Sequence, residues 1–230
     1  MTIAIIGAGY AGLAAAVELA CRGQQVEVFE ASRSLGGRAR AVKIDEMTVD
    51  NGQHILLGAY TETLRLMRII GTDPHHLLKR LPLHLEFPGD MRLVAPRLPA
   101  PLHTLAALLF ATGLDWREKW AAIRLMHRLQ RRQFRITPDV SVATWLDHNK
   151  TPSRQRRLLW GPLCIAALNT PIANASAQVL ANVLRDSLAA SREASDLLLP
   201  QVDLSALFPE PAAAFITQRG SIIHCGQRVT

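Results

Sequence analysis

Apolar runs and one glycine-rich turn alternate over the first thirty residues. Residues 2–6 (TIAII) form a short β-branched run that is typical of a buried strand. Residues 13–22 are rich in Ala and Leu and predict a helix that Gly23 ends. Residues 25–29 (QVEVF) alternate as a second strand, directly before Glu30. The pattern therefore predicts a complete βαβ unit.

The next part of the chain predicts shorter elements. A hairpin-like stretch ends near Val49, and residues 60–70 have the spacing of a helix. Short strands are expected in residues 81–94, on either side of the turn Pro88-Gly89-Asp90. Three prolines then precede an apolar stretch at 102–114, which is too short to span a membrane and is typical of a core or an interfacial helix.

A basic amphipathic helix is expected at residues 115–135. The large ring-bearing and aliphatic residues that fall roughly on one of its faces are Trp116, Trp120, Ile123, His127 and Phe134. Its basic residues are Arg117, Lys119, Arg124, Arg128, Arg131, Arg132 and Arg135. With Asp115 and Glu118, these seven positive charges give the helix +5 of the chain's net +7. Beside an apolar stretch and two tryptophans, this predicts an anionic membrane surface as a partner.

The second half of the chain predicts mostly helices. Residues 140–188 are typical of helices, the proline-bounded region 199–211 predicts a loop, and a helix, a glycine turn and a strand are expected in 212–230. The domain prediction is a first nucleotide-binding segment at 1–80, a mostly helical domain at 81–211 that faces the substrate or a membrane, and a return to the first domain at 212–230.

Composition limits the classes of protein that remain. Apolar residues make up 49% of the 230-residue chain and charged residues 20%, so a packed core forms, and disorder, collagen and coiled coil are excluded as overall descriptions. Aromatic residues are only 5%, too few for a base-stacking surface, and no nucleic-acid partner is expected. The three cysteines form no CxxC pair, so no metal site is predicted. The N-terminus lacks the pattern of a signal peptide and predicts a cytoplasmic protein, whose oligomeric state stays open.

The turn between the first strand and helix has the glycines of a dinucleotide site. Gly7 permits a tight turn, Gly9 lets the backbone approach a pyrophosphate, and Gly12 lets the helix pack closely on the strands. Glu30 lies 18 residues beyond Gly12, where a carboxylate accepts hydrogen bonds from ribose hydroxyls and would repel the 2′-phosphate of NADP. This unit alone leaves NAD and FAD open.

A second glycine loop favours FAD. Gly36, Gly37 and Arg38 follow Glu30 closely, and the guanidinium of Arg38 could reach the pyrophosphate with two hydrogen bonds. In this order, the motifs resemble those of the FAD-dependent amine oxidase and phytoene desaturase superfamily. The resemblance implies an α/β fold, with a Rossmann-like FAD-binding domain interrupted by a mostly helical substrate domain. It also implies that Gly52 lies in the cofactor site and that Val229 packs near the adenine.

Later segments narrow the resemblance to the hydroxysqualene dehydroxylase family. The residues that carry it are 50–54 (DNGQH), 161–164 (GPLC), 167–171 (ALNTP), 185–188 (RDSL) and 196–200 (DLLLP). The chain resembles the N-terminal part of such a protein, and the resemblance implies that the C-terminal part of the FAD domain is missing. The implied reaction replaces the allylic hydroxyl of hydroxysqualene, an apolar isoprenoid, by hydrogen to give squalene, with the protein peripheral on the inner face of a membrane.

The leaving hydroxyl requires an acid, for which three residues are candidates. His54 is the first, since an imidazole titrates near neutral pH and the resemblance implies a place near the flavin ring. Asn169 and Asp50 are weaker candidates, because turn-forming and capping roles explain both equally well. Two other functions stay open: an oxidative carotenoid-type desaturase or amine oxidase, and an inactive fragment that only binds a nucleotide or a partner.

Overall fold

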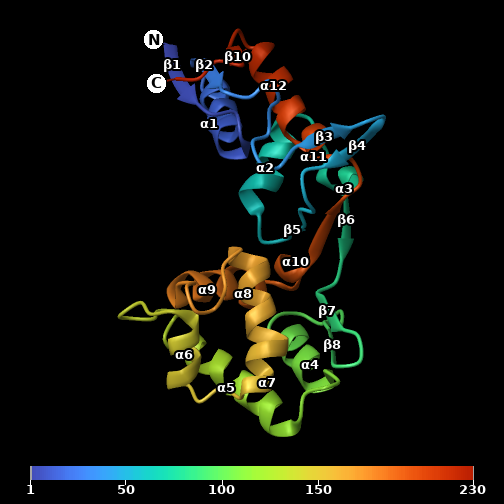
Figure 1. Ribbon diagram of the computed structural model, residues 1–230, viewed down its shortest axis with the longest axis vertical. Coiled ribbons are helices and arrows are strands. Elements are labelled where there is room, and N and C mark those ends of the chain that lie inside the picture. Colours follow the sequence, from blue (N-terminus) through green and yellow to red (C-terminus); the bar gives the residue numbers. More distant parts are fainter. Residues whose placement is uncertain (1, 230) are drawn as a thin grey trace. The chain divides into compact units, whose positions relative to one another are not determined.

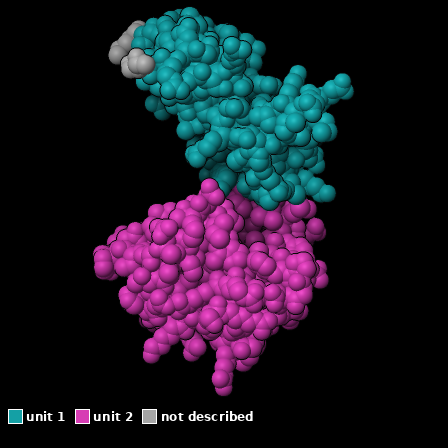
Figure 2. All heavy atoms as spheres, viewed as in Figure 1, with its two compact units in different colours: residues 1–56, 60–80, 198–230 teal, residues 57–59, 81–197 magenta. Residues whose placement is uncertain are grey.

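The computed structural model describes residues 2–229, and the chain forms two compact units. Unit 1 contains Met1–Leu56, Tyr60–Arg80 and Leu198–Thr230, and unit 2 contains Leu57–Ala59 and Leu81–Leu197 (Figure 2). The chain therefore leaves unit 1 and later returns to it, so that segments far apart in sequence share one core.

A parallel three-stranded sheet in the order β1-β2-β10 is the centre of the nucleotide motif in unit 1 (Figure 1). Its strands are β1 (Thr2–Ile6), β2 (Gln25–Glu30) and β10 (Ile222–Cys225). Helix α1 (Tyr10–Cys21) buries one apolar face and packs against α12 (Pro209–Thr217). The predicted βαβ unit is confirmed, although α1 begins earlier than expected because Gly9, and not Gly12, is its N-cap.

The remaining elements of unit 1 are short. They are the antiparallel hairpin of β3 (Ala41–Ile44) and β4 (Met47–Asp50), the helices α2 (Thr61–Ile69), α3 (Pro74–Leu77) and α11 (Leu204–Leu207), and a sheet in the order β5-β9-β6 with β5 (Leu56–Leu57), β9 (Leu197–Pro200) and β6 (Leu78–Leu81). The hairpin and the helix predicted near residues 60–70 are confirmed.

Residues 199–211 are not the loop that the prolines suggested. The Asp203 carboxylate accepts hydrogen bonds from the N–H groups of Ser205 and Ala206 and so starts α11. Leu207 and Phe208 are buried in the core of unit 1. Because these apolar side chains pack there, the chain rejoins unit 1 at residue 198, and not at residue 212 as the sequence pattern indicated.

Unit 2 is mostly helical, as the pattern of residues 140–188 predicted. The hairpin of β7 (His84–Phe87) and β8 (Met91–Val94) precedes α4 (Leu102–Phe110), α5 (Trp116–Arg131), α6 (Val142–His148), α7 (Ser153–Gln155), the π-helical turn η1 (Arg156–Trp160), α8 (Gly161–Leu168), α9 (Ala177–Leu184), the π-helical turn η2 (Arg185–Ala189) and α10 (Arg192–Ser195). None of the helices in residues 2–229 is both long and apolar enough to cross a membrane.

Helix α5 has a defined start and a defined end. Asp115 and Glu118 form a capping box at its start, each side chain accepting from the other's backbone N–H. The helix ends at Arg131, because Gln133 and Phe134 adopt left-handed backbone conformations. Phe134 is buried, whereas the predicted aromatic face of the helix is exposed, so the expectation that Phe134 shares this face is wrong.

A buried histidine is expected to make unit 2 sensitive to acid. The side chain of His103 on α4 is fully buried, and neither ring nitrogen has a hydrogen-bond partner. Burial lowers the pKa of His103 and Arg192 adds to this effect, while Asp196 and Glu193 oppose it. Since the unfolded chain binds this proton more readily, the free energy of unfolding falls as the pH drops below about 6.5, the ordinary value for histidine.

Replacing this side chain tests the acid sensitivity. The variant His103→Leu is expected to lose less stability than the unmodified chain between neutral and mildly acidic pH. Thermal unfolding followed by circular dichroism over this pH range measures the difference. An identical decline in both proteins would show that other groups cause the acid sensitivity.

Candidate functional site

The two glycine loops predicted from the sequence lie against each other in unit 1. The backbone N–H of Gly36 donates to the carbonyl of Ala8 at 2.8 Å, and Gly9 and Gly36 form a parallel bridge. A Cβ on Gly37 would lie 3.3 Å from the Cα of Gly9. This close approach of two backbones leaves little space for a side chain on Gly37, whose φ of 61° also favours glycine, and it forms a cradle at the start of α1.

The first glycine turn has the geometry that an anion site requires. The N–H of Gly7 donates to the carbonyl of Phe29 at 2.7 Å, which holds the turn at the end of β2. A Cβ on Gly12 would lie 1.9 Å from the carbonyl oxygen of Gly7, so only glycine fits there. No side chain caps the first turn of α1, and its N–H groups and positive dipole end point toward the cradle.

Glu30, at the end of the neighbouring strand β2, holds the same turn through its side chain. One carboxylate oxygen accepts from the N–H of Ala8 at 2.7 Å, and the other accepts from the N–H of Ser32 at 2.8 Å. Each carboxylate oxygen can accept a further hydrogen bond. Glu30 therefore fixes the glycine turn, a role that the sequence did not predict. Its remaining lone pairs leave it able to accept hydrogen bonds from ribose hydroxyls, which stays a prediction from its position after β2.

Removing the Glu30 carboxylate tests this positioning. The variant Glu30→Ala leaves the N–H groups of Ala8 and Ser32 without their acceptor and is expected to lower the free energy of unfolding by about 1–2 kcal/mol. Glu30→Gln keeps one carbonyl acceptor and should lose less. Urea unfolding of the three proteins measures the order, and equal stability of Glu30→Ala and the unmodified chain would contradict it.

Asn51 connects the second loop to the predicted motif at residues 50–54. Its side-chain amide donates to the carbonyl of Arg38 at 3.1 Å, and its backbone N–H donates to the carbonyl of Arg40. The side chain of Arg38 is exposed, and Gly52 follows in a left-handed conformation. Sequence reasoning missed Asn51, although an Asn before a Gly is itself a turn signal.

The returning segment reaches the same end of the sheet. After β10, the N–H of Gly226 donates to the carbonyl of Ser32, and that of Gln227 donates to the carbonyl of Glu30, both at 2.9 Å. Val229 follows and is half-exposed. The structure therefore brings the chain near Val229 to the Glu30 turn, and the packing of Val229 near the adenine stays a prediction.

Asp50 has a structural contact in unit 1. Its carboxylate accepts from the N–H of Leu204 at 2.8 Å, at the start of α11, and the hydroxyl of Tyr10 donates to the Leu204 carbonyl. Burial, together with the charges of Asp50 and Asp203, raises the pKa of Tyr10 well above its usual value, so its hydroxyl stays protonated. This network anchors α11 to α1 and β4.

The other two candidate catalytic residues, His54 and Asn169, lie in different units. His54 belongs to unit 1 and is exposed, two residues after the turn at Gly52. Asn169 belongs to unit 2, where it ends α8 in a left-handed conformation that asparagine tolerates better than most residues. The geometry thus gives Asn169 a turn role and leaves the imidazole of His54 accessible.

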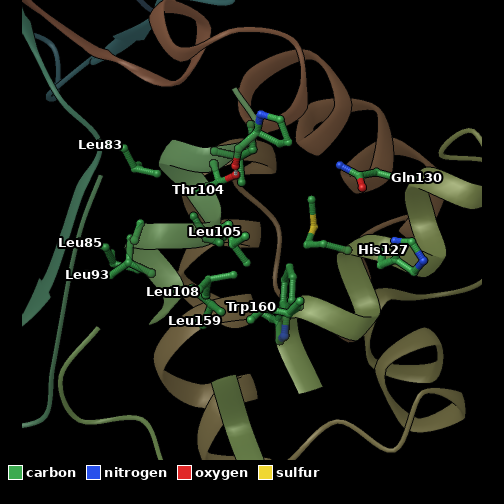
Figure 3. A pocket seen from close by; sticks show the side chains of 16 residues that line it. Leu83, Leu85, Leu93, Thr104, Leu105, Leu108, His127, Gln130, Leu159 and Trp160 are labelled. Atoms are coloured by element: carbon green, nitrogen blue, oxygen red, sulfur yellow. Dashed lines mark hydrogen bonds between the residues drawn. The ribbon is translucent and has the colours of Figure 1, made fainter. Parts of the chain in front are cut away.

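Unit 2 contains an apolar cavity of about 240 Å³. Side chains from β7, β8, α4, α5, η1, α8 and η2 surround it (Figure 3). In this view Leu85 and Leu93 lie on one side, His127 and Gln130 on the other, and Leu105 between them. The lining residues are Leu83, Leu85, Leu93, Pro101, Thr104, Leu105, Ala107, Leu108, Ile123, Met126, His127, Gln130, Leu159, Trp160, Leu163 and Leu188. A cavity with this lining suits a hydrocarbon ligand that carries few polar groups.

Curated relatives match almost the whole chain. It is 30% identical to a hydroxysqualene dehydroxylase of Sinorhizobium fredii over 98% of this chain and 53% of the relative. It is 26% identical to a probable zeta-carotene desaturase of Synechococcus elongatus, over 100% of this chain and 50% of that protein. The chain therefore spans about half the length of these relatives.

The fold and the family agree with the motifs. An oxidoreductase from Methanosarcina mazei superposes with a TM-score of 0.70 and 17% identity, over 100% of this chain and 52% of that one, which confirms the predicted Rossmann-like fold. The family model described as flavin containing amine oxidoreductase matches residues 10–230. The glycine cradle, which a Cβ on Gly37 would fill, fits the flavin nucleotide that this family name implies. The chain thus belongs to the flavin-containing amine oxidoreductase family, and its cofactor is FAD.

Proposed function

We propose that the protein takes part in the FAD-dependent replacement of the allylic hydroxyl of hydroxysqualene by hydrogen, which yields squalene. The observation that carries the proposal is the apolar cavity of unit 2, which suits a segment of an isoprenoid chain. The hydroxysqualene dehydroxylase from Sinorhizobium fredii, at 30% identity over nearly all of this chain, supports this choice of substrate.

The reaction balances with one acid and one reductant. The C–O bond breaks, the hydroxyl leaves as water after it receives a proton, and the same carbon gains a hydrogen with two electrons. An allylic carbon permits this because the positive charge that develops on it is delocalised over the adjacent double bond. Reduced FAD, when bound, supplies the two electrons and the hydrogen, and the protein supplies the proton and the orientation.

Unit 1 would hold the cofactor by backbone groups and two charged side chains. The N–H groups at the start of α1 would bind the pyrophosphate, which Gly9 would let approach without a Cβ in the way. Arg38 is exposed next to Gly37 and would offer a planar pair of donors to the same phosphates. The remaining lone pairs of Glu30 would accept hydrogen bonds from the ribose.

His54 is the residue proposed to protonate the leaving hydroxyl. Its side chain is accessible, whereas the Asp50 carboxylate is already engaged by the N–H of Leu204. The turn at Gly52 and the hydrogen bond from the Asn51 side chain to the Arg38 carbonyl support this role, because they tie the backbone before His54 to the second glycine loop. An imidazole in this position can donate a proton and take up another from solvent between turnovers.

A second candidate function is the desaturation of a carotenoid-type polyene. The similarity to the zeta-carotene desaturase of Synechococcus elongatus, at 26% identity, favours it. Both reactions use an apolar isoprenoid and FAD, but the electrons move in opposite directions. A desaturase removes hydrogen from its substrate and reduces the cofactor, whereas the proposed reaction oxidises it.

The direction of electron transfer distinguishes the candidates. The purified protein is loaded with FAD, reduced without oxygen and mixed with hydroxysqualene while the flavin absorbance is followed. Recovery of the oxidised-flavin bands supports dehydroxylation. Reduction of the oxidised protein by zeta-carotene instead would support desaturation. Absence of flavin bands after FAD is added would support a chain that binds partners without catalysis.

A further inference from the structure

Large apolar side chains are exposed on α4 and α5 of unit 2. The exposed fractions are 81% for Phe110 at the end of α4, and 59% for Trp116 and 44% for Trp120 on α5. The two indole rings lie edge to face, with centroids 5.7 Å apart. We call these three residues the aromatic strip. Exposed apolar side chains gathered in this way indicate a surface that contacts another apolar phase.

Arg117, Arg124 and Arg131 form a basic row beside the aromatic strip. They are seven residues apart on α5, which places them on one line along the helix. Arg117 and Arg124 lie three residues before and four residues after Trp120, so this line runs next to the tryptophans. In the part of the chain that the structure describes, none of the three makes an ion pair. Lys119 and Arg128 differ, since their side chains donate to the Leu109 carbonyl and to the Asn149 amide oxygen.

Acidic side chains do not balance this row on the helix. Glu118 is buried on the opposite side of α5 and belongs to the capping box with Asp115. The sequence had assigned seven basic residues to a common surface, and the structure narrows this set to the three that lie beside exposed tryptophans. In an anionic lipid surface, apolar rings can contact the acyl chains, and guanidinium groups without an ion-pair partner can bind the phosphate headgroups.

The apolar cavity opens beside this face. Leu105 and His127 line the cavity and are themselves exposed, and His127 lies on the same side of α5 as Trp116 and Trp120. A hydrocarbon ligand that leaves a bilayer at this face would therefore meet the cavity without crossing water.

We propose that the aromatic strip and the basic row form a docking surface for an anionic lipid bilayer, from which the cavity takes up its apolar ligand. The second part rests on the proposed function, whereas docking itself does not. The rings of Phe110, Trp116 and Trp120 enter the headgroup region, and the basic row contacts lipid phosphates. A second copy of the chain is a poorer partner, because it would bring another uncompensated row of arginines to the same face.

The tryptophans provide a direct measure of docking. Of the four tryptophans, Trp116 and Trp120 are exposed, while Trp145 and Trp160 are buried in the core of unit 2. Mixing the chain with vesicles of phosphatidylcholine and phosphatidylglycerol is expected to shift the fluorescence to shorter wavelength, and brominated acyl chains should quench it. Neutral phosphatidylcholine vesicles or high salt should weaken the binding.

Matched variants separate the aromatic from the basic contribution. Arg117→Gln/Arg124→Gln should weaken binding to the anionic vesicles about 25-fold, since each basic residue near such a surface contributes about a fivefold factor. Trp116→Ala/Trp120→Ala should weaken it at least about tenfold and abolish the spectral shift. The control Lys150→Gln/Arg154→Gln also removes two exposed positive charges. Both residues precede Gln155, whose side chain donates to the Glu118 carbonyl on the buried side of α5, so this variant should leave binding to the vesicles nearly unchanged.

The outcomes are distinct from those of the enzymatic proposal. If the variants bind vesicles in the predicted order but the protein does not consume hydroxysqualene, the docking proposal stands and the proposed substrate is wrong. Equal binding to neutral and anionic vesicles, equal losses in the control and in the Arg117→Gln/Arg124→Gln variant, or a blue shift caused by self-association without vesicles would each overturn the proposal. Circular dichroism of every variant verifies that unit 2 remains folded.

Discussion

The Gly12→Ala variant is expected to lose the fold of unit 1 and, with it, the binding of FAD. A methyl group at this position would lie 1.9 Å from the carbonyl oxygen of Gly7 and 3.5 Å from the side chain of Ile5. Backbone cannot rotate away as a side chain does, so α1 must move off β1. Overpacking of this kind costs about 3 kcal/mol or more, a large part of the stability of a small unit.

Gly9→Ala is the matched control because it adds the same methyl group where the chain has room. Gly9 has an ordinary φ of −72°, and its nearest neighbour to a new Cβ is the Cα of Gly37 at 4.0 Å. This variant should fold with nearly unchanged stability but bind FAD about 10- to 100-fold more weakly, since the methyl group enters the cradle. Urea unfolding and flavin titration measure both. Full stability of Gly12→Ala, or unweakened FAD binding by Gly9→Ala, would contradict the assignment of the cradle.

The second large effect is expected at His54. Replacing it by alanine removes the proposed proton donor and should lower kcat for hydroxysqualene by about 100- to 10,000-fold, the range that a general acid contributes. Binding of FAD should not change, because the side chain of His54 is exposed and, within residues 2–229, no hydrogen bond or ion pair joins it to the glycine cradle. Turnover with reduced flavin, measured beside the flavin content of the same sample, separates these two quantities.

The same substitution at another exposed histidine of unit 1 provides the control. His75→Ala alters α3 in the same unit and should keep both flavin and turnover. If His54→Ala turns over at the unmodified rate with full flavin, the proton comes from another group. If His54→Ala loses flavin, the residue has a positioning role in the cofactor site.

The nucleotide site was predictable because its residues are close in sequence and each obeys a local rule. The turn at Gly7–Gly12 follows a strand and precedes a helix, and Glu30 ends the next strand, so one βαβ unit fixes all of their positions. The Gly36–Arg38 loop was expected to reach the same cofactor, but its direct backbone contact with this turn was not predicted. The hydrogen bonds of Asn51 and Asp50 join segments far apart in the chain, which local patterns do not determine.

Unit 2 shows where the pattern of polar and apolar residues is ambiguous. Trp116, Trp120 and His127 have the spacing of a buried helix face, but the structure buries Ala122, Leu125 and Leu129 instead. Helical periodicity identifies faces without stating which of them meets the core, because that choice depends on the partners that the fold supplies. The cavity illustrates the same point, since its lining comes from seven separate elements.

The most direct test of the proposed reaction is a single anaerobic turnover of the FAD-loaded, reduced protein with hydroxysqualene in deuterated water. Hydrogen on reduced flavin exchanges with solvent, so the squalene formed should carry a single deuterium at the carbon that lost the hydroxyl, in an amount equal to the flavin reoxidised. Squalene without this label, or a flavin that stays reduced in the presence of hydroxysqualene, would contradict the proposal.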